Sequence, residues 1–210
     1  GRWGVVLERT VRELQGQPCI GLEDAPPAKQ QIACTRSFGH PVTELSDLIE
    51  AISEFASRAA QKLRSQSSVA GQILIFAHTS PFRPGPKFSK SIVVPLRRPT
   101  ADSRLLVQAA GAGVRQMHQP GYRLAKAGVL LMDLMPDTIS QGELDFDAPE
   151  SRDRNKLMVA MDAINDRFGR GAIHVGSAVG AGVDRAWSMR QERLTPQYTT
   201  KWSDMPVARA

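Results

Sequence analysis

The sequence predicts an α+β protein. Its central unit, residues 29–135, has the β-α-β-β-α-β order of the split arrangement, with one four-stranded sheet and both helices on one sheet face. Two observations support this fold. Two segments carry apolar residues at helical spacing, and two others, residues 71–80 and 87–97, carry apolar residues at every second position. A smaller region, residues 151–210, follows and is expected to be mainly helical or irregular.

The first strand and the first helix are expected at residues 31–38 and in the segment after Thr43. Alternation in residues 31–38 is imperfect. Thr43 is expected to cap the helix, and Glu44 in the first turn suits the positive end of the helix dipole. The helix carries one apolar stripe: Leu45, Leu48, Ile49, Ile52, Phe55, Ala56, Ala59 and Leu63.

The remaining strands are expected at residues 71–80, 87–97 and 122–133, and the second helix at residues 100–119. Pro95 has no amide hydrogen, so its strand should lie at a sheet edge or end there. Gly111 and Gly113 weaken the second helix. The residues expected on one apolar face of each element are Ile73, Ile75 and Ala77; Ile92, Val94 and Leu96; and Leu105, Leu106, Ala109, Val114 and Met117. We expect a sheet that combines antiparallel and parallel neighbours, with one face open for binding.

Helical and irregular segments flank the central unit. Residues 5–14 place three apolar residues on one helical face, and proline and glycine in residues 15–28 predict a linker. Because the chain begins at Gly1 rather than Met, we expect a piece of a longer protein. A helix over residues 151–168 should end at Gly169. Its apolar residues are Leu157, Met158, Met161, Ile164 and Phe168. Because Met158, Met161, Phe168, Trp187, Tyr198 and Trp202 require cover, we expect residues 151–210 to fold against the central unit or against themselves. The alternative is a mobile docking tail that folds only on a partner.

Charge is distributed unevenly along the 210 residues, whose net charge is +6. Residues 29–135 carry 14 basic and 6 acidic side chains, whereas residues 136–150 carry 5 acidic and no basic ones. Residues 151–210 carry 10 basic and 6 acidic side chains. The basic central unit suggests an acidic partner, with an acidic connector beside it. The two cysteines match neither a zinc site nor a disulfide framework, and no apolar run is long enough for a membrane span.

No catalytic constellation is evident in the sequence. The four histidines are scattered, and the carboxylates cluster only in the acidic connector. The glycines at 176, 180 and 182 resemble a phosphate-binding loop only superficially, because the Lys-Ser/Thr ending is missing. We therefore expect no active site, metal or cofactor in this chain.

The basic central unit is interpreted as a nucleic-acid binder. Its strands and their borders carry cations and small hydroxyl residues: Arg36, Lys87, Lys90, Arg97 and Lys126, with Thr35, Ser37, Ser89 and Ser91. Cations attract the phosphate backbone without sequence preference, and small residues let phosphates approach closely. No aromatic pair has RNA-recognition spacing, so phosphate contacts should dominate. The alternative is that these cations form an ordinary solvated face.

The segment Gln141-Gly142-Glu143-Leu144-Asp145-Phe146 has the pattern of a linear docking peptide. Gln141 would set the register by hydrogen bonds, while Leu144 and Phe146 would fill a pocket on a partner. The segment resembles the peptide with which bacterial DNA polymerases and repair factors bind the sliding clamp. The alternative is a loop whose Leu144 and Phe146 pack onto the chain's own core.

Several sequence blocks, in order, resemble the C-terminal half of UmuC-type Y-family translesion DNA polymerases. They are VVLERTVREL, QQIACTRSFG, EFASRAAQKLR, TSPF, YRLAKAGVLLMD, LTPQYTTKW and MPVARA. The resemblance implies that residues 1–14 end the thumb, 15–28 form a linker and 29–135 form the DNA-gripping little finger. It further implies an acidic connector with the clamp-binding peptide at 136–150 and a UmuC-type C-terminal region at 151–210.

The same resemblance implies a role in damage tolerance during the SOS response. The implied partners are primer–template DNA, the sliding clamp, the processed UmuD accessory subunit and a RecA filament, in the bacterial cytoplasm. The parent protein would be a DNA-directed DNA polymerase that uses magnesium in a palm domain upstream, so this chain alone should be inactive. The alternative is a stand-alone, non-catalytic nucleic-acid adaptor.

Overall fold

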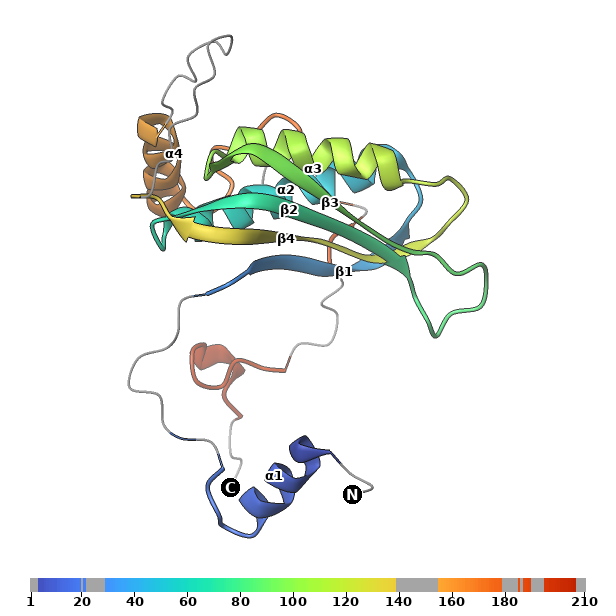
Figure 1. Ribbon diagram of the computed structural model, residues 1–210, viewed down its shortest axis with the longest axis vertical. Helices are drawn as coiled ribbons and strands as arrows, with labels where there is room; N and C mark the ends of the chain where they lie inside the picture. Colours follow the sequence, from blue (N-terminus) through green and yellow to red (C-terminus); the bar gives the residue numbers. More distant parts are fainter. Residues whose placement is uncertain are drawn as a thin grey trace.

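The computed structural model describes residues 4–19, 21, 29–138, 155–178, 185, 187–189 and 195–206. Helices and strands follow the expected order (Figure 1). Their bounds are α1 Val5–Leu14, β1 Ile32–Val42, α2 Leu45–Arg64, β2 Ser68–Thr79, β3 Ser89–Thr100, α3 Ser103–Met117, β4 Leu124–Pro136, α4 Asn155–Phe168 and the short 3-10 helix η1 Trp202–Asp204. The expected acidic connector lies almost entirely outside the described residues.

The four strands form one sheet in the order β1-β4-β2-β3, and all three neighbouring pairs are antiparallel. The expectation of mixed neighbours is therefore wrong. β1 and β2 do run in the same direction, but β4 lies between them, and β2 likewise separates β3 from β4. β3 is an edge strand, where the sequence analysis expected the strand that contains Pro95.

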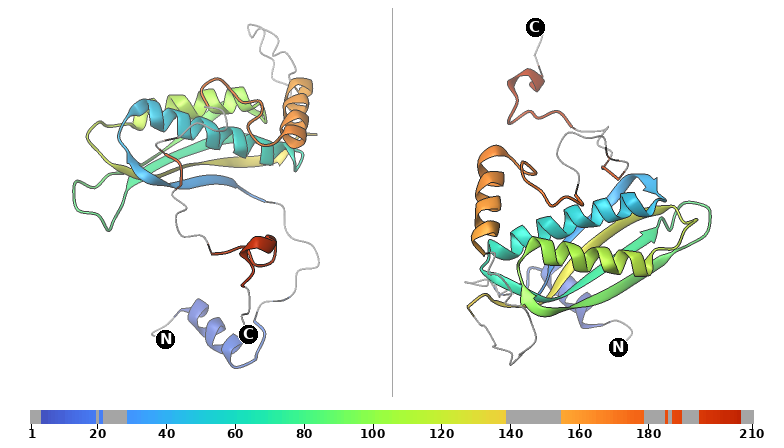
Figure 2. Two further views of the ribbon diagram at one scale, coloured as in Figure 1. Left: turned by 180° about the vertical axis from the view of Figure 1, so that it is seen from behind. Right: turned by 90° about the horizontal axis from the view of Figure 1, so that it is seen from above.

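Helices α2 and α3 cover one face of the sheet (Figures 1 and 2). The apolar stripe of α2 is confirmed, since six of its eight residues are buried and Leu45 and Ile49 pack against the core. The residue that caps α2 is Glu44 rather than Thr43, and its side chain makes no cap hydrogen bond. Thr43 instead donates its hydroxyl to the Glu44 carboxylate at 3.2 Å.

Helix α3 approaches the sheet closely because of Gly113. A Cβ at this position would lie 2.7 Å from Cδ1 of Ile75 and 3.1 Å from Cγ2 of both Ile92 and Val94. Gly113 thus lowers the intrinsic stability of the helix but lets α3 pack closely on the sheet. The prediction that Leu105 faces inward is wrong, since this side chain is 38% exposed. Leu105 lies beside the buried face of α3, which includes Leu106, Ala110 and Val114.

The C-terminal region docks on the helical layer through Arg64 at the end of α2. The Arg64 guanidinium binds both carboxylate oxygens of Asp162 on α4, at 2.6 and 2.7 Å. Its remaining terminal nitrogen donates to the Ala101 carbonyl at 2.6 Å and to the Ser103 hydroxyl at 2.9 Å. Next to this pair, the Ser103 amide donates to the buried Met158 sulfur at 3.4 Å. One arginine therefore ties α2, α3 and α4 together.

A second attachment is made by Trp187, which is 2% exposed and joins the central core. Its ring meets that of Phe55 edge to face, with 5.6 Å between centroids, and its indole nitrogen donates to Glu50 at 2.9 Å. The Ser188 carbonyl accepts a hydrogen bond from the Gly39 amide of β1. The region was expected to fold against the central unit or against itself, and α4 and Trp187 do contact the central unit.

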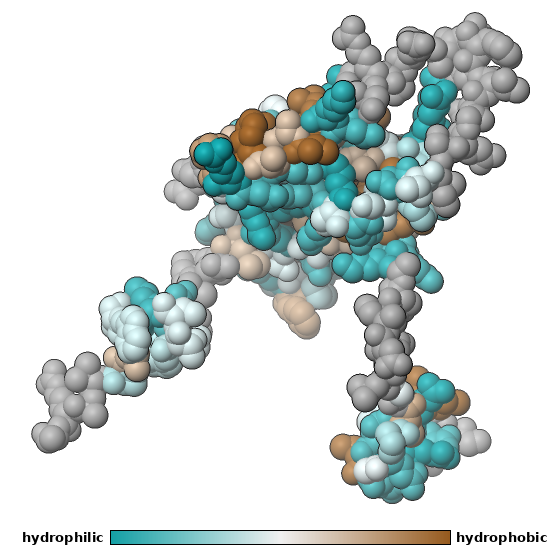
Figure 3. Space-filling view, turned by 90° about the vertical axis from the view of Figure 1, so that its left-hand side faces the viewer, coloured by the Kyte–Doolittle hydropathy of each residue, from teal (hydrophilic) through white to brown (hydrophobic). Residues whose placement is uncertain are grey.

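Other apolar side chains of the flanking segments are exposed. Tyr198, Phe168 and Trp202 are 52%, 69% and 87% exposed, so the expectation that these side chains are covered is wrong for all three. No residue of α1 is buried. On the side of the molecule nearest α4, hydrophilic residues cover most of the central mass and apolar residues form small patches (Figure 3).

Candidate nucleic-acid interface

The sheet face opposite the helices carries two polar rows that cross all four strands. Directly opposed residues of antiparallel strands lie on the same face. The register therefore aligns Ser37, Lys126, His78 and Ser89 in one row, and Thr35, Gly128, Phe76 and Ser91 in the next. In both rows hydroxyl residues stand at the sheet edges. All four hydroxyl residues singled out in the sequence thus share this open face.

Gly128 keeps the middle of the second row flat. A Cβ there would lie 2.5 Å from Cγ2 of Thr35 and 2.9 Å from Cε1 of Phe76. The Phe76 ring stacks on the His78 ring with 6.2 Å between centroids. The sequence prediction missed both aromatic side chains, although their alternation with the buried Ile75 and Ala77 would have placed them on the opposite face.

The five cations singled out in the sequence are not brought together. Lys126 lies on the open face, but Arg36 and Lys90 pair with the core residues Ala127 and Ala77, which places them on the helix side. Arg36 borders a groove there with Arg58 and Lys62 of α2. Arg97 is exposed near the end of the edge strand β3.

Lys87 has a structural partner set in the loop between β2 and β3. Its ammonium donates to the carbonyl oxygens of Ser80 and Pro81 at 3.0 and 3.1 Å, and to that of Arg83. An ammonium has three hydrogens to donate, so these contacts use all of them. Lys87 therefore organises the loop. Two further cations near this end of the sheet, Arg83 and Arg123, are exposed and were missed by the sequence prediction.

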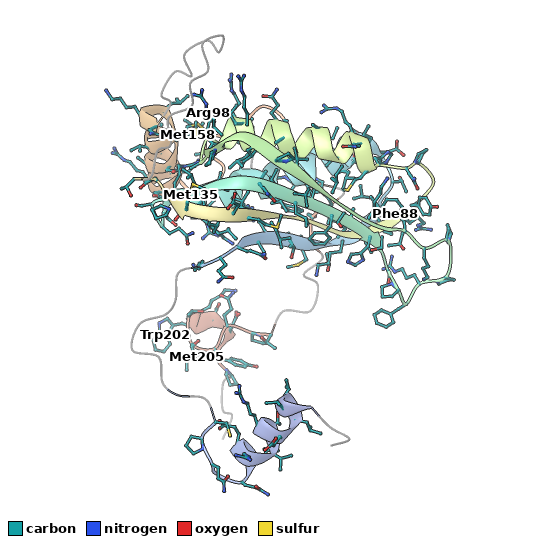
Figure 4. All side chains as sticks on the ribbon, in the orientation of Figure 1. Phe88, Arg98, Met135, Met158, Trp202 and Met205 are labelled. Carbon is teal, nitrogen blue, oxygen red and sulfur yellow. The ribbon has the colours of Figure 1, made fainter. Side chains whose placement is uncertain are left out.

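The other half of the open face is apolar. Its row aligns Ala33, Leu130, Leu74 and Val93. Phe88 and Met135 mark the two ends of the sheet in Figure 4, and the polar rows lie toward Phe88. The cations and hydroxyls are therefore concentrated at the end from which the β2–β3 loop emerges.

Cys34 lies on the helix side of β1, near the groove that Arg36 borders. Burial raises the pKa of its thiol, although the nearby cations Lys62, Arg58 and Arg36 oppose this shift. A raised pKa disfavours the nucleophilic thiolate. Within the described residues, no group of three or more histidine, cysteine or acidic side chains could hold a metal ion. No helix in that same part of the chain is long and apolar enough to cross a membrane.

The candidate clamp-binding residues Gln141, Leu144 and Phe146 lie outside the described residues. Their role stays a prediction from the sequence.

Comparisons with known proteins agree with the sequence resemblance. The family model for the impB/mucB/samB family C-terminal domain matches residues 29–144, and a model for a domain of unknown function, DUF4113, matches residues 155–208. Protein ImpB of Salmonella typhimurium is 42% identical over 99% of this chain and 48% of its own length. Protein UmuC of Salmonella typhimurium strain LT2 is 40% identical over 97% of this chain and 48% of its own length.

A solved structure described as an insertion ternary complex of Dbh DNA polymerase is also similar, with a TM-score of 0.42 and 9% identity over 60% of this chain and 34% of that one. The family model covers more than half of the chain, so the chain belongs to the impB/mucB/samB family. The chain spans about half the length of the relatives named above.

Proposed function

We propose that this chain is the DNA-gripping half of a translesion DNA polymerase, and that the open face of the sheet contacts the backbone of primer–template DNA. The observation that carries the proposal is the pair of polar rows, in which hydroxyls and Lys126 replace the apolar residues that a covered face would need. The family membership and the resemblance to UmuC-type polymerases support the same function.

The contact should be electrostatic and independent of base sequence. The open face offers hydroxyl donors and cations but little that could distinguish one base pair from another. Catalytic magnesium would be held by another part of the parent protein. The processed UmuD subunit and a RecA filament remain proposed partners from the resemblance, without an assigned contact.

Salt titration of duplex binding by the whole chain tests this function. If Lys126, Arg83 and Arg123 each neutralise one phosphate, log affinity should fall with log salt at a slope of roughly −3. Lys126→Glu should weaken binding on every duplex sequence. Arg104→Glu, which changes an exposed cation of α3 on the helix side, is the matched control. Binding that does not depend on salt would contradict the proposal.

We also propose that Gln141, Leu144 and Phe146 tether the chain to a ring-shaped sliding clamp. A short peptide binds weakly because ordering it offsets much of the contact energy. DNA held by the open face would make the second contact intramolecular and so raise the combined affinity. The double variant Leu144→Ala, Phe146→Ala should abolish clamp binding in calorimetry and leave duplex binding unchanged. Equal clamp affinity for both proteins would favour a loop packed on the chain's own core.

A further inference from the structure

The loop between β2 and β3 projects beyond the end of the sheet, toward the open face and away from the helices (Figures 1 and 2). It carries Phe82, which is 95% exposed, the highest exposure among the large apolar side chains of the described residues. We propose that Phe82 stacks on an unpaired nucleobase of the DNA that the open face holds. The proposal deepens the proposed function and rests on it.

The loop is held in shape by specific contacts. Lys87 donates to three of its carbonyl oxygens, and the Phe82 amide donates to the Ser80 hydroxyl at 3.3 Å. At its base, the Thr79 amide donates to the Phe88 carbonyl at 2.9 Å, and the Phe88 amide donates to the Thr79 hydroxyl at 3.0 Å. The Phe88 ring packs on Tyr122 with 4.9 Å between centroids. The exposed ring is therefore carried by an ordered support, which lowers the entropy cost of binding.

The surroundings of Phe82 suit a nucleotide. Phe82, Arg83, His78, Ser37 and Lys126 all line one open hollow of about 270 Å³. This volume is near the lower end of small-molecule sites, which begin at about 300 Å³. A base stacked on Phe82 could thus keep its phosphate within reach of Lys126 or Arg83.

The charge around the hollow favours nucleic acid over a protein partner. Residues 79–91 and 118–127 contain no acidic side chain, and Arg83 and Lys126 line the hollow. Phe82 has only proline, glycine, arginine and lysine as exposed loop neighbours, so it stands as a single ring among cations. An aromatic ring beside cations suits single-stranded nucleic acid, in which bases stack on aromatic side chains while cations contact the backbone.

The test compares two DNA ligands with the whole chain: a blunt duplex, and the same duplex with an unpaired template overhang. Phe82→Ala should weaken binding to the overhang DNA about tenfold, as expected when one aromatic–base stack is lost, and leave blunt-duplex binding unchanged. Phe82→Trp should retain the preference for the overhang. Phe168→Ala, which removes another exposed phenylalanine on α4, is the matched control and should change neither affinity.

A fluorescent base analogue at the first unpaired template position gives a second measurement. Its fluorescence should be quenched by the unchanged chain and by Phe82→Trp, but not by Phe82→Ala. Equal affinity of Phe82→Ala and the unchanged chain for both ligands, with equal quenching, would overturn the proposal and leave protein docking as the role of the loop. Lys126→Glu tests the open face separately. If this variant binds blunt duplex as well as the unchanged chain does, the proposed function fails, whereas the Phe82 variants test only the stacking.

Discussion

The two faces of the sheet are built from the same four strands but differ in what they contact. On the helix side, Ile73, Ile75 and Val129 are fully buried beneath α2 and α3. The open side carries the alternate residues of the same strands, among them Phe76, His78 and Gly128. Helices α2 and α3 both lie on the other side of the sheet (Figure 1). The helix side is determined by packing, and its buried centre is aliphatic, whereas Arg36 and Lys90 lie toward its two edges. Among the described residues no helix packs on the open side, so packing does not explain its hydroxyls, its cation and its aromatic rings. The proposed contact with the DNA backbone would explain them.

The largest expected effect comes from paired phenylalanine truncations on the two faces. Phe55→Ala removes a fully buried ring that also supports Trp187, and should lower the free energy of unfolding by about 4 kcal/mol. Phe76 on the open face is half-buried, so Phe76→Ala should lower the free energy of unfolding by only about 1 kcal/mol. Its main effect should be weaker DNA binding. Urea unfolding and duplex titration measure the two effects. Equal losses of stability would show that the faces do not differ as described.

Arg64→Ala should cause the next largest loss of stability, because it leaves the partly buried Asp162 carboxylate without its bidentate partner. We expect a loss of about 2–3 kcal/mol of stability and faster proteolysis within residues 155–178. Arg104→Ala removes an exposed arginine of α3 and should change stability by less than about 0.5 kcal/mol. Unaltered proteolysis in Arg64→Ala would mean that α4 docks through other contacts.

Two glycines of α3 give a matched comparison of packing against helix propensity. Gly113→Ala places a methyl group within 2.7 Å of Ile75 and should destabilise the protein by about 1–2 kcal/mol. Gly111→Ala meets only the flexible end of Arg115, at 3.3 Å, and should be neutral or stabilise by up to about 1 kcal/mol. Thermal unfolding of both variants measures the difference, and the opposite order would contradict the close approach of α3.

The smallest expected effect is the difference in duplex affinity between charge reversals of Arg36 and Lys126, which the sequence analysis grouped together. Arg36→Glu, on the helix side of β1, should change duplex affinity by no more than about twofold, whereas Lys126→Glu should weaken it about tenfold. The reason is distance from the bound backbone, since exposed charges interact weakly beyond about 10 Å in salt. Fluorescence anisotropy in one buffer checks both variants. A stronger effect of Arg36→Glu would place the DNA over the β1 edge and the groove beside α2.

Most of the local structure was predictable, and much of the candidate site was not. The predictions of the apolar stripe of α2 and of the alternation of Ile73, Ile75 and Ala77 are correct, because periodic burial requires apolar residues at regular spacing along the chain. The alternation around Arg36 was too imperfect to assign its face. The sequence predicts Lys87 as a phosphate contact. Its local sequence does not indicate that its ammonium donates to three loop carbonyls.

The order of the elements, the apolar faces and the basic character of residues 29–135 follow from the amino-acid sequence. These properties depend on spacing along the chain and on composition. The tertiary structure places β4 between β1 and β2, which aligns Ser37, Lys126 and His78 in one row. It also decided that Trp187 packs on Phe55, 132 positions earlier in the chain. Such contacts join distant segments, and their free energy comes from mutual burial, to which no local pattern is sensitive.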